Sequence, residues 1–230
     1  MAVQDGLQAI ARGHVRLLAC EPQDAHGEIT EALFGTVAAK YSTVGMVGIV
    51  RRSQVEGSAL VRLVRAGAHA LLMADDRLTT LDCRRVLTEA IVRSGVCAPG
   101  MGLLAASPPG VRPLLEYGLR YAHESTTVAN AARALNVHRK TLFWWCVEAG
   151  VPAPQQILGW CRLLAAAALL DDEGRRVDHI ALDLDFPSGT ALRNLLQRYV
   201  GLSPAKLRTL GASRHIHHLF RRALNSVVAI

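Results

Sequence analysis

Two short stretches in the second half of the chain decide the fold: ARALNVHRKTL at residues 132–142 and ALDLDFPSGTAL at residues 181–192. Each has Ala, then Leu three positions later, then Asn136 or Asp185, then an apolar residue, and the second copy carries one extra residue. Asn and Asp are the non-glycine residues that best accept a left-handed backbone. Because the turn of a helix-turn-helix needs such a residue, the repeat predicts two of these motifs.

The segment between the two copies is typical of one long helix. Its apolar residues Ile157, Cys161, Leu164 and Ala168 recur at helical spacing within Gln155–Leu170. A helix of this length spans roughly 24 Å, and the width of the motifs at its ends adds to that. Two recognition helices could then lie about 34 Å apart, which is one turn of DNA. We therefore expect one polypeptide to read successive major grooves without dimerising.

Basic side chains are concentrated in this half of the chain. Of 230 residues, 26 are Lys or Arg and 19 are Asp or Glu. Residues 111–230 hold 15 basic and 9 acidic side chains, whereas residues 1–110 hold 11 and 10. A basic domain either meets a polyanion or is simply well solvated, so charge alone leaves both readings open. Together with the repeat, the charge favours DNA.

The first half of the chain alternates between strand and helix patterns. Short apolar runs predict buried strands at Val15–Cys20, Val44–Val50 and Ala70–Ala74. Apolar spacing predicts helices at Ile29–Lys40, Glu56–Ala66 and Leu81–Val92. This alternation indicates βαβ units, with a small parallel sheet covered on both faces.

The expected organisation is an α/β domain followed by an all-α domain. The α/β domain takes residues 1–95, and the Gly- and Pro-rich segment Val96–Arg112 predicts a linker at 96–112. Two helix-turn-helix motifs joined by a long helix occupy 113–210. Residues 211–230 form a basic tail or an extra helix, which would pack through Ile216, Leu219 and Phe220 and place Arg221 and Arg222 near DNA.

The cysteines and the apolar runs limit the chemistry and the compartment. The cysteines are Cys20, Cys83, Cys97, Cys146 and Cys161. Their odd number, with no CxxC and no paired His, argues against a disulfide framework and against zinc. The chain start lacks a basic segment followed by an apolar one, and the run Leu163–Leu170 is far short of the roughly 20 residues that span a bilayer. We expect a cytoplasmic protein without metal, cofactor or membrane contact.

Thr127–Arg208 resembles the DNA-binding domain of AraC/XylS-type bacterial transcription regulators. The stretches that carry the resemblance are VANAARALNVHRKTL at 128–142, PQQILGWCRLLAAAALLDD at 154–172, and VDHIALDLDFPSGTALRNLLQRYVGLSPAKLR at 177–208. The last is the most specific, through Phe186, Leu192, Tyr199–Pro204 and Arg208. The resemblance implies seven helices, a recognition helix in each motif, and promoter binding as a monomer or a dimer.

The resemblance also implies which side chains meet DNA. The base-facing residues would be Lys140, Phe143 and Trp144 in the first motif and Gly189, Thr190, Arg193 and Asn194 in the second. Phosphate contacts, which fix register without reading sequence, would come from Arg139, Ser188 and Arg198.

The first motif departs from the family pattern. His138 stands where members have a small hydroxyl residue, and Phe143 and Trp144 stand where members have polar ones. Aromatic side chains can touch thymine methyls but cannot make the bidentate bonds that distinguish bases. We therefore expect Arg139 and Lys140 to meet DNA, Trp145 and Cys146 to lie toward the core, and most specificity to come from Arg193 and Asn194.

The N-terminal half resembles a response-regulator receiver domain that has lost its opening strand. The resemblance is carried by LLACEPQDAHG, Leu17–Gly27, and by VRAGAHALLMAD, Val64–Asp75. In a working receiver a phosphate-accepting Asp would stand at Ala19 and a Lys near Ala74. An alanine methyl is neither a nucleophile nor a metal ligand, so this resemblance implies no phosphorylation. Such a domain would serve as a partner or dimerisation surface.

The sequence as a whole predicts a bacterial transcription regulator that is not an enzyme. It would bind double-stranded promoter DNA and either contact RNA polymerase or occlude the promoter. Two alternatives are a weakly specific DNA-binding protein and a degenerate regulator that acts as a protein-interaction module. An enzyme alternative is a cysteine-based alkyl-transfer or redox-sensing protein, for which Cys83 beside Arg84 and Arg85 is the best-placed thiol.

Overall fold

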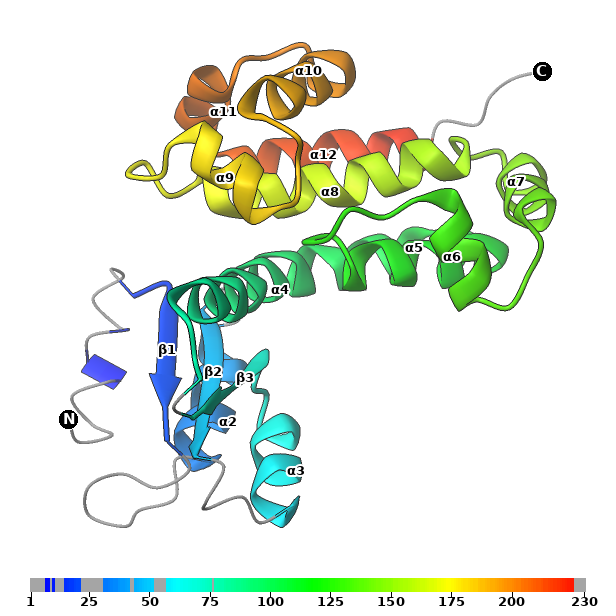
Figure 1. Cartoon of the computed structure of the whole chain (residues 1–230). Helices are drawn as coiled ribbons and strands as arrows, with labels where there is room; N and C mark the ends of the chain where they lie inside the picture. The colour runs from blue at the N-terminus through cyan, green and yellow to red at the C-terminus, as the bar shows by residue number, and fades with distance from the viewer. Residues whose placement is uncertain are drawn as a thin grey trace. The chain divides into compact units, whose positions relative to one another are not determined.

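The computed structural model describes residues 7–8, 10, 15–21, 31–41, 44–51, 57–75 and 77–225. The chain divides into two compact units, an N-terminal unit of Met1–Gly95 and a C-terminal unit of Val96–Ile230 (Figure 1). The predicted helix starts at Ile29 and Glu56, and the receiver-like loop up to Gly27, lie outside the described residues.

The N-terminal unit contains a small parallel sheet. Its strands are β1 (Leu17–Cys20), β2 (Gly45–Arg51) and β3 (Ala70–Ala74), and they lie side by side in the order β1-β2-β3. Both pairings are parallel, with Ala19 opposite Val47 and Val47 opposite Ala70. All three predicted strands are therefore present, and the parallel arrangement agrees with the alternating pattern of the sequence.

Helices cover both faces of this sheet. They are α2 (Glu31–Lys40), α3 (Gly57–Arg65) and the first part of α4 (Thr80–Ala106). Alternate strand residues face opposite ways, so Met46 and Val50 pack with Phe34 of α2 and Leu63 of α3. Val47, Ala70 and Leu72 face the other way and pack with Val86, Leu87 and Ala90 of α4. Because successive strand side chains point to opposite faces, the sheet has one apolar layer on each side.

The segment 96–112, predicted as a linker, is helical over most of its length, because helix α4 runs without a break to Ala106. A 3-10 turn, η2 (Pro109–Val111), and helix α5 (Arg112–Arg120) follow it directly. Val96 and Leu103 are buried, and an added Cβ on Gly100 would lie 3.1 Å from a methyl of Leu119. Gly100 would weaken a helix in isolation, but here its lack of a side chain leaves room for Leu119 of α5, so packing outweighs local propensity.

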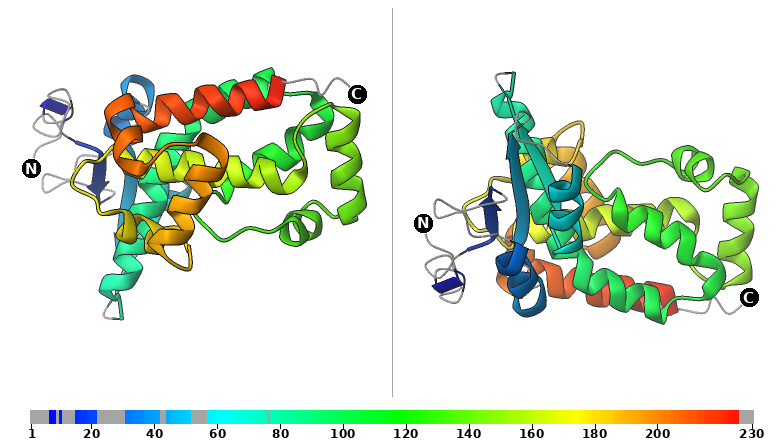
Figure 2. Two further views of the ribbon diagram at one scale, coloured as in Figure 1. Left: turned by 90° about the horizontal axis from the view of Figure 1, so that it is seen from above. Right: turned by 90° about the horizontal axis from the view of Figure 1, so that it is seen from below.

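Helices are the only regular secondary structure in the described residues of the C-terminal unit. After α5 come α6 (Val128–Ala134), α7 (Arg139–Glu148), α8 (Pro154–Leu170), α9 (Val177–Asp183), α10 (Gly189–Val200), α11 (Pro204–Leu210) and α12 (Ala212–Asn225). The long helix predicted from the apolar spacing is α8, whose 17 residues extend about 26 Å. It runs through the unit with α5 and α12 beside it (Figure 2).

The basic C-terminal segment contains helix α12, which packs against α8. Ile216 and Phe220 are fully buried, and the Phe220 ring stacks on Trp160 of α8 with ring centroids 5.5 Å apart. The rings of Trp160 and Tyr199 are also nearly perpendicular, with centroids 5.1 Å apart, so one tryptophan contacts both α10 and α12 from α8. Residues 212–225 form an extra helix of the core, and its exposed side carries Arg214, Arg221 and Arg222.

Candidate nucleic-acid interface

Helices α6 and α7 (the first helix pair) and α9 and α10 (the second helix pair) are joined by the same kind of turn. Asn136 has φ 53° and Asp185 has φ 52°, and no other described residue except glycine has a positive φ. In each turn the next amide donates to a carbonyl five residues back, Val137 to Ala132 at 2.9 Å and Phe186 to Ala181 at 2.8 Å. The left-handed backbone predicted at both positions is confirmed.

The second helix of each pair shows one burial pattern. Residues 141–150 and 191–200 match position by position in their exposure classes, with an offset of 50. Leu142 and Cys146 of α7 point into the core, as do Leu192 and Leu196 of α10. On the outer side, positions 143, 144 and 147 therefore correspond to 193, 194 and 197.

Side chains close the exposed amino ends of α7 and α10. At α10 the Ser188 Oγ accepts a hydrogen bond from the Ala191 amide at 3.2 Å. At α7 the His138 Nδ1 accepts one from the Lys140 amide at 3.2 Å. The imidazole thus performs the capping that a small hydroxyl or carboxylate residue usually performs. This explains how the first helix pair accommodates a residue that departs from the family pattern.

The outer face of α10 is polar. Thr190, Arg193 and Asn194 are exposed, and the Arg193 guanidinium lies 3.3 Å from an Asp178 carboxylate oxygen of α9. Both side chains of this ion pair are about half exposed, so it contributes less than about 1 kcal/mol and can open. Sequence reasoning identified Arg193 and Asn194 but missed Asp178, which no local pattern connects to α10.

Gly189, predicted to face a base, does not offer a surface to one. It is buried at the start of α10, and an added Cβ would lie 1.8 Å from the Asp178 Oδ1. Its lack of a side chain is what allows Asp178 to approach the helix end. Gly189 therefore shapes the second helix pair from within.

The outer face of α7 is largely apolar. The exposed fractions of Phe143, Trp144 and Val147 are 42%, 69% and 63%. With Lys140 these side chains line an open groove of about 230 Å³. Arg139 is also exposed at the start of the helix. Trp145 is half-buried and Cys146 is buried, as expected. Val147 was missed, although its spacing of four and three residues from Phe143 and Trp144 places it on their face.

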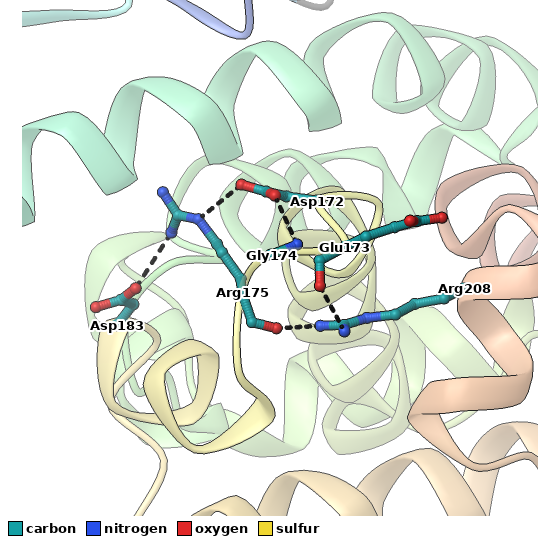
Figure 3. Close-up of polar contacts among 6 residues, drawn as sticks. All are labelled: Asp172, Glu173, Gly174, Arg175, Asp183 and Arg208. Atoms are coloured by element: carbon teal, nitrogen blue, oxygen red, sulfur yellow. Dashed lines mark hydrogen bonds and ion pairs between the residues drawn. The ribbon is translucent and has the colours of Figure 1, made fainter.

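A network of arginines holds the loop between α8 and α9 (Figure 3). The Arg208 guanidinium donates to the Glu173 carbonyl at 3.1 Å and to the Arg175 carbonyl. Arg175 in turn pairs with Asp172 at 3.4 Å and with Asp183 of α9 at 3.2 Å. Arg208 therefore positions the segment that precedes α9. From the sequence, this residue was identified only as part of the family signature, with no role assigned to it.

Arg162 of α8 anchors the second turn itself. Its guanidinium donates to the Leu184 carbonyl and lies 3.8 Å from the centre of the Phe186 ring. Burial lowers the pKa of Arg162, and the nearby Asp185 carboxylate opposes that shift. A single charged residue inside the apolar run ILGWCRLLAAAALL was the signal in the sequence for such a contact.

Three of the described cysteines lie in surroundings that favour the protonated thiol. Burial raises the pKa of Cys146 to about 11 and also raises the pKa of Cys161, so both thiols are protonated at neutral pH. Burial likewise raises the pKa of Cys20. Within the part of the chain that the structure describes, no group of three or more His, Cys, Asp or Glu side chains could hold a metal ion.

The two positions that would carry receiver chemistry do not lie together. Ala19 of β1 is level with Val47 and Ala70, whereas Ala74 lies four residues further along β3, opposite Arg51. Four residues of strand correspond to about 13 Å. The parallel sheet is compatible with an α/β domain of several kinds, and the receiver likeness stays a prediction.

Comparison with known proteins bears on the helical unit alone. Residues 131–210 match the model of a helix-turn-helix domain family. The C-terminal unit contains a helix-turn-helix domain. The match runs from α6 to the end of α11. It supports the resemblance of this region to AraC-type DNA-binding domains and the prediction of a DNA-binding transcription regulator. No curated protein and no solved structure matches the chain. Among the helices described, none has the length and hydropathy needed to cross a membrane.

Proposed function

We propose that the chain regulates transcription by binding promoter DNA with both helix pairs, α7 and α10 each entering a major groove. The observation that carries this proposal is the correspondence between the two pairs, which share their turn, their turn hydrogen bond and the burial pattern of the second helix. A helix pair of this form presents its second helix to the major groove. Two pairs in one chain would read two successive grooves.

The surroundings of these helices suit a polyanion. Arg139 and Lys140 are exposed at the start of α7, and Arg198 is exposed on α10. A cleft of about 550 Å³ lies between the two pairs, and Gln155, Gln156 and Arg198 are among its lining residues. These groups can bind the phosphates that separate neighbouring major grooves, which sets register without reading sequence.

Helix α10 carries the groups for direct readout. Arginine makes paired hydrogen bonds to guanine, and asparagine makes them to adenine, in the major groove. Arg193 and Asn194 are adjacent and exposed, and Thr190 lies one turn before them. Opening of the ion pair between Arg193 and Asp178 would free the guanidinium for a base.

The test is to select bound sequences from a random DNA pool and then to compare two variants. Arg193→Ala should relax the preference at one half-site and cost about 1–3 kcal/mol at the cognate base. Arg198→Ala should weaken binding to all sequences and reduce the salt dependence by about one phosphate contact. Absence of any salt-dependent binding refutes the proposal, and equal losses on all sequences for Arg193→Ala refute direct readout by that residue.

For the N-terminal unit we propose contact with a protein partner, either a second copy or RNA polymerase, without phosphorylation. The support is an apolar stripe on α3, where Val61 and Val64 are exposed by 50% and 55%. Ala19 and Ala74 provide no phosphate-accepting group. Light scattering of the full chain and of a Val61→Asp/Val64→Asp variant tests self-association. A stable acyl-phosphate after incubation with acetyl phosphate and Mg²⁺ would refute the absence of phosphorylation.

A further inference from the structure

Helix α7 has a surface that polar base recognition does not explain. We propose that the first helix pair recognises thymine through its C5-methyl group, which would enter the apolar groove formed by Phe143, Trp144 and Val147. This inference rests on the proposed function and names the chemistry that the first half of the operator would contain.

Phe143 and Trp144 stand where α10 places its proposed reading groups, and Val147 lies on the same face. By the shared burial pattern Phe143 corresponds to Arg193, Trp144 to Asn194, and Val147 to Gln197, all of which are exposed. Large apolar side chains exposed together on one helix face mark a contact surface. The position of this surface on α7 is therefore the position from which a base edge would be read.

Thymine is the base that fits such a surface. In the major groove the edges of the four bases carry hydrogen-bond donors and acceptors, and the C5-methyl of thymine is their apolar group. The groove of about 230 Å³ is large enough for a methyl group, and its lining is apolar apart from Lys140.

The charges around the groove favour DNA over an apolar protein partner. Lys140 forms part of the groove and Arg139 lies beside it at the start of α7. Two cations at the rim suit the phosphates that flank the base edges of a major groove. Glu148, the acidic residue of α7, lies at the opposite end of the helix.

The experiment removes methyl groups one at a time. In the duplex selected by the wild-type chain, each thymidine is replaced by deoxyuridine, which changes only the C5-methyl to hydrogen. The half-site of the first helix pair is the one whose preferences survive in Arg193→Ala. There, loss of a contacted methyl should weaken binding about fourfold, as expected for one buried apolar carbon. In the Phe143→Ala/Trp144→Ala variant the same replacement should have no effect.

Two controls separate this effect from others. Met101→Ala removes another exposed apolar side chain, 64% exposed and outside both helix pairs, and should leave the response to deoxyuridine unchanged. Replacing the critical T·A pair with 5-methylcytosine·guanine should bind more tightly than the same pair without the methyl. Circular dichroism of each variant verifies the fold, which exposed substitutions should preserve.

The outcomes are distinguishable. No salt-dependent shift on any DNA refutes the proposed function and this inference with it. Salt-dependent binding with no effect of deoxyuridine in the first half-site, or an equal effect in the double variant, refutes this inference alone. If Phe143→Ala/Trp144→Ala keeps full DNA affinity but loses retention by RNA polymerase, the groove is a protein surface and the inference is again overturned.

Discussion

Helices α7 and α10 have the same backbone setting and different outer faces. Their turns differ by one degree in φ at the left-handed residue, and their burial patterns coincide. Yet α10 exposes Arg193 and Asn194 where α7 exposes Phe143 and Trp144. The inner positions are constrained by packing, whereas the outer ones are free to change. The difference therefore shows that the fold of a helix pair and the chemistry it offers to a partner are independent.

The two pairs also differ in how they are held. Arg162 and Arg208 fix the second pair by hydrogen bonds to main-chain carbonyls of the segments around α9. In α6 and α7 of the first pair the buried side chains are apolar: Ala131, Ala132, Leu142 and Cys146. Polar anchoring specifies one geometry, while apolar packing depends mainly on volume. We expect the second pair to be the more sensitive to loss of a single polar side chain.

The largest expected effect tests the shared packing. Leu142→Ala and Leu192→Ala remove equivalent, fully buried side chains and should each lower the free energy of unfolding by about 2–5 kcal/mol. Urea unfolding followed by tryptophan fluorescence measures this, because Trp144, Trp145 and Trp160 all lie in the C-terminal unit. If one variant loses less than half as much as the other, the two pairs are not packed alike.

A smaller effect should separate the two pairs. Arg208→Met removes both hydrogen bonds to the loop before α9 and should lower the free energy of unfolding by about 2 kcal/mol. Amide exchange should accelerate in α9 and remain unchanged in α6. Arg133→Met, at an exposed arginine of α6, is the control and should change little. Equal acceleration in both pairs would show that Arg208 supports the whole unit.

The sequence predicted those features that depend on neighbouring residues. Asn136 and Asp185 were predicted because a left-handed turn restricts the residue type, and the strands because their apolar runs are short and bounded. Helix α4 was cut short because Gly and Pro weaken a helix locally, while burial of Val96 and Leu103 depends on segments distant in sequence. The contacts of Arg162, Asp178 and Arg208 are also long-range, so no spacing rule identifies them.

Gly189 allows a third test, which concerns the start of α10. Gly189→Ala brings a methyl against the Asp178 carboxylate, which must turn away from Arg193, so the free energy of unfolding should fall by up to about 1 kcal/mol, the most that this exposed ion pair contributes. Adding Asp178→Ala should cause little further loss, because the ion pair is already broken. At the equivalent position of α7, Arg139→Ala should be nearly neutral because that residue is exposed. A double variant clearly less stable than Gly189→Ala would mean that the ion pair survives the added methyl.

The smallest expected effects concern the two capping residues. Ser188→Ala removes the hydroxyl that accepts from Ala191 and should lower the free energy of unfolding by about 1 kcal/mol. His138→Ala should lower it by a similar amount if the imidazole is an equivalent cap, whereas His138→Ser should keep the stability within about 0.5 kcal/mol. Stability of His138→Ala equal to the wild type would instead mean that α7 begins without help from that side chain. The first pair would then owe its helix start to packing, and the likeness of the two pairs would be confined to the turn and the buried face.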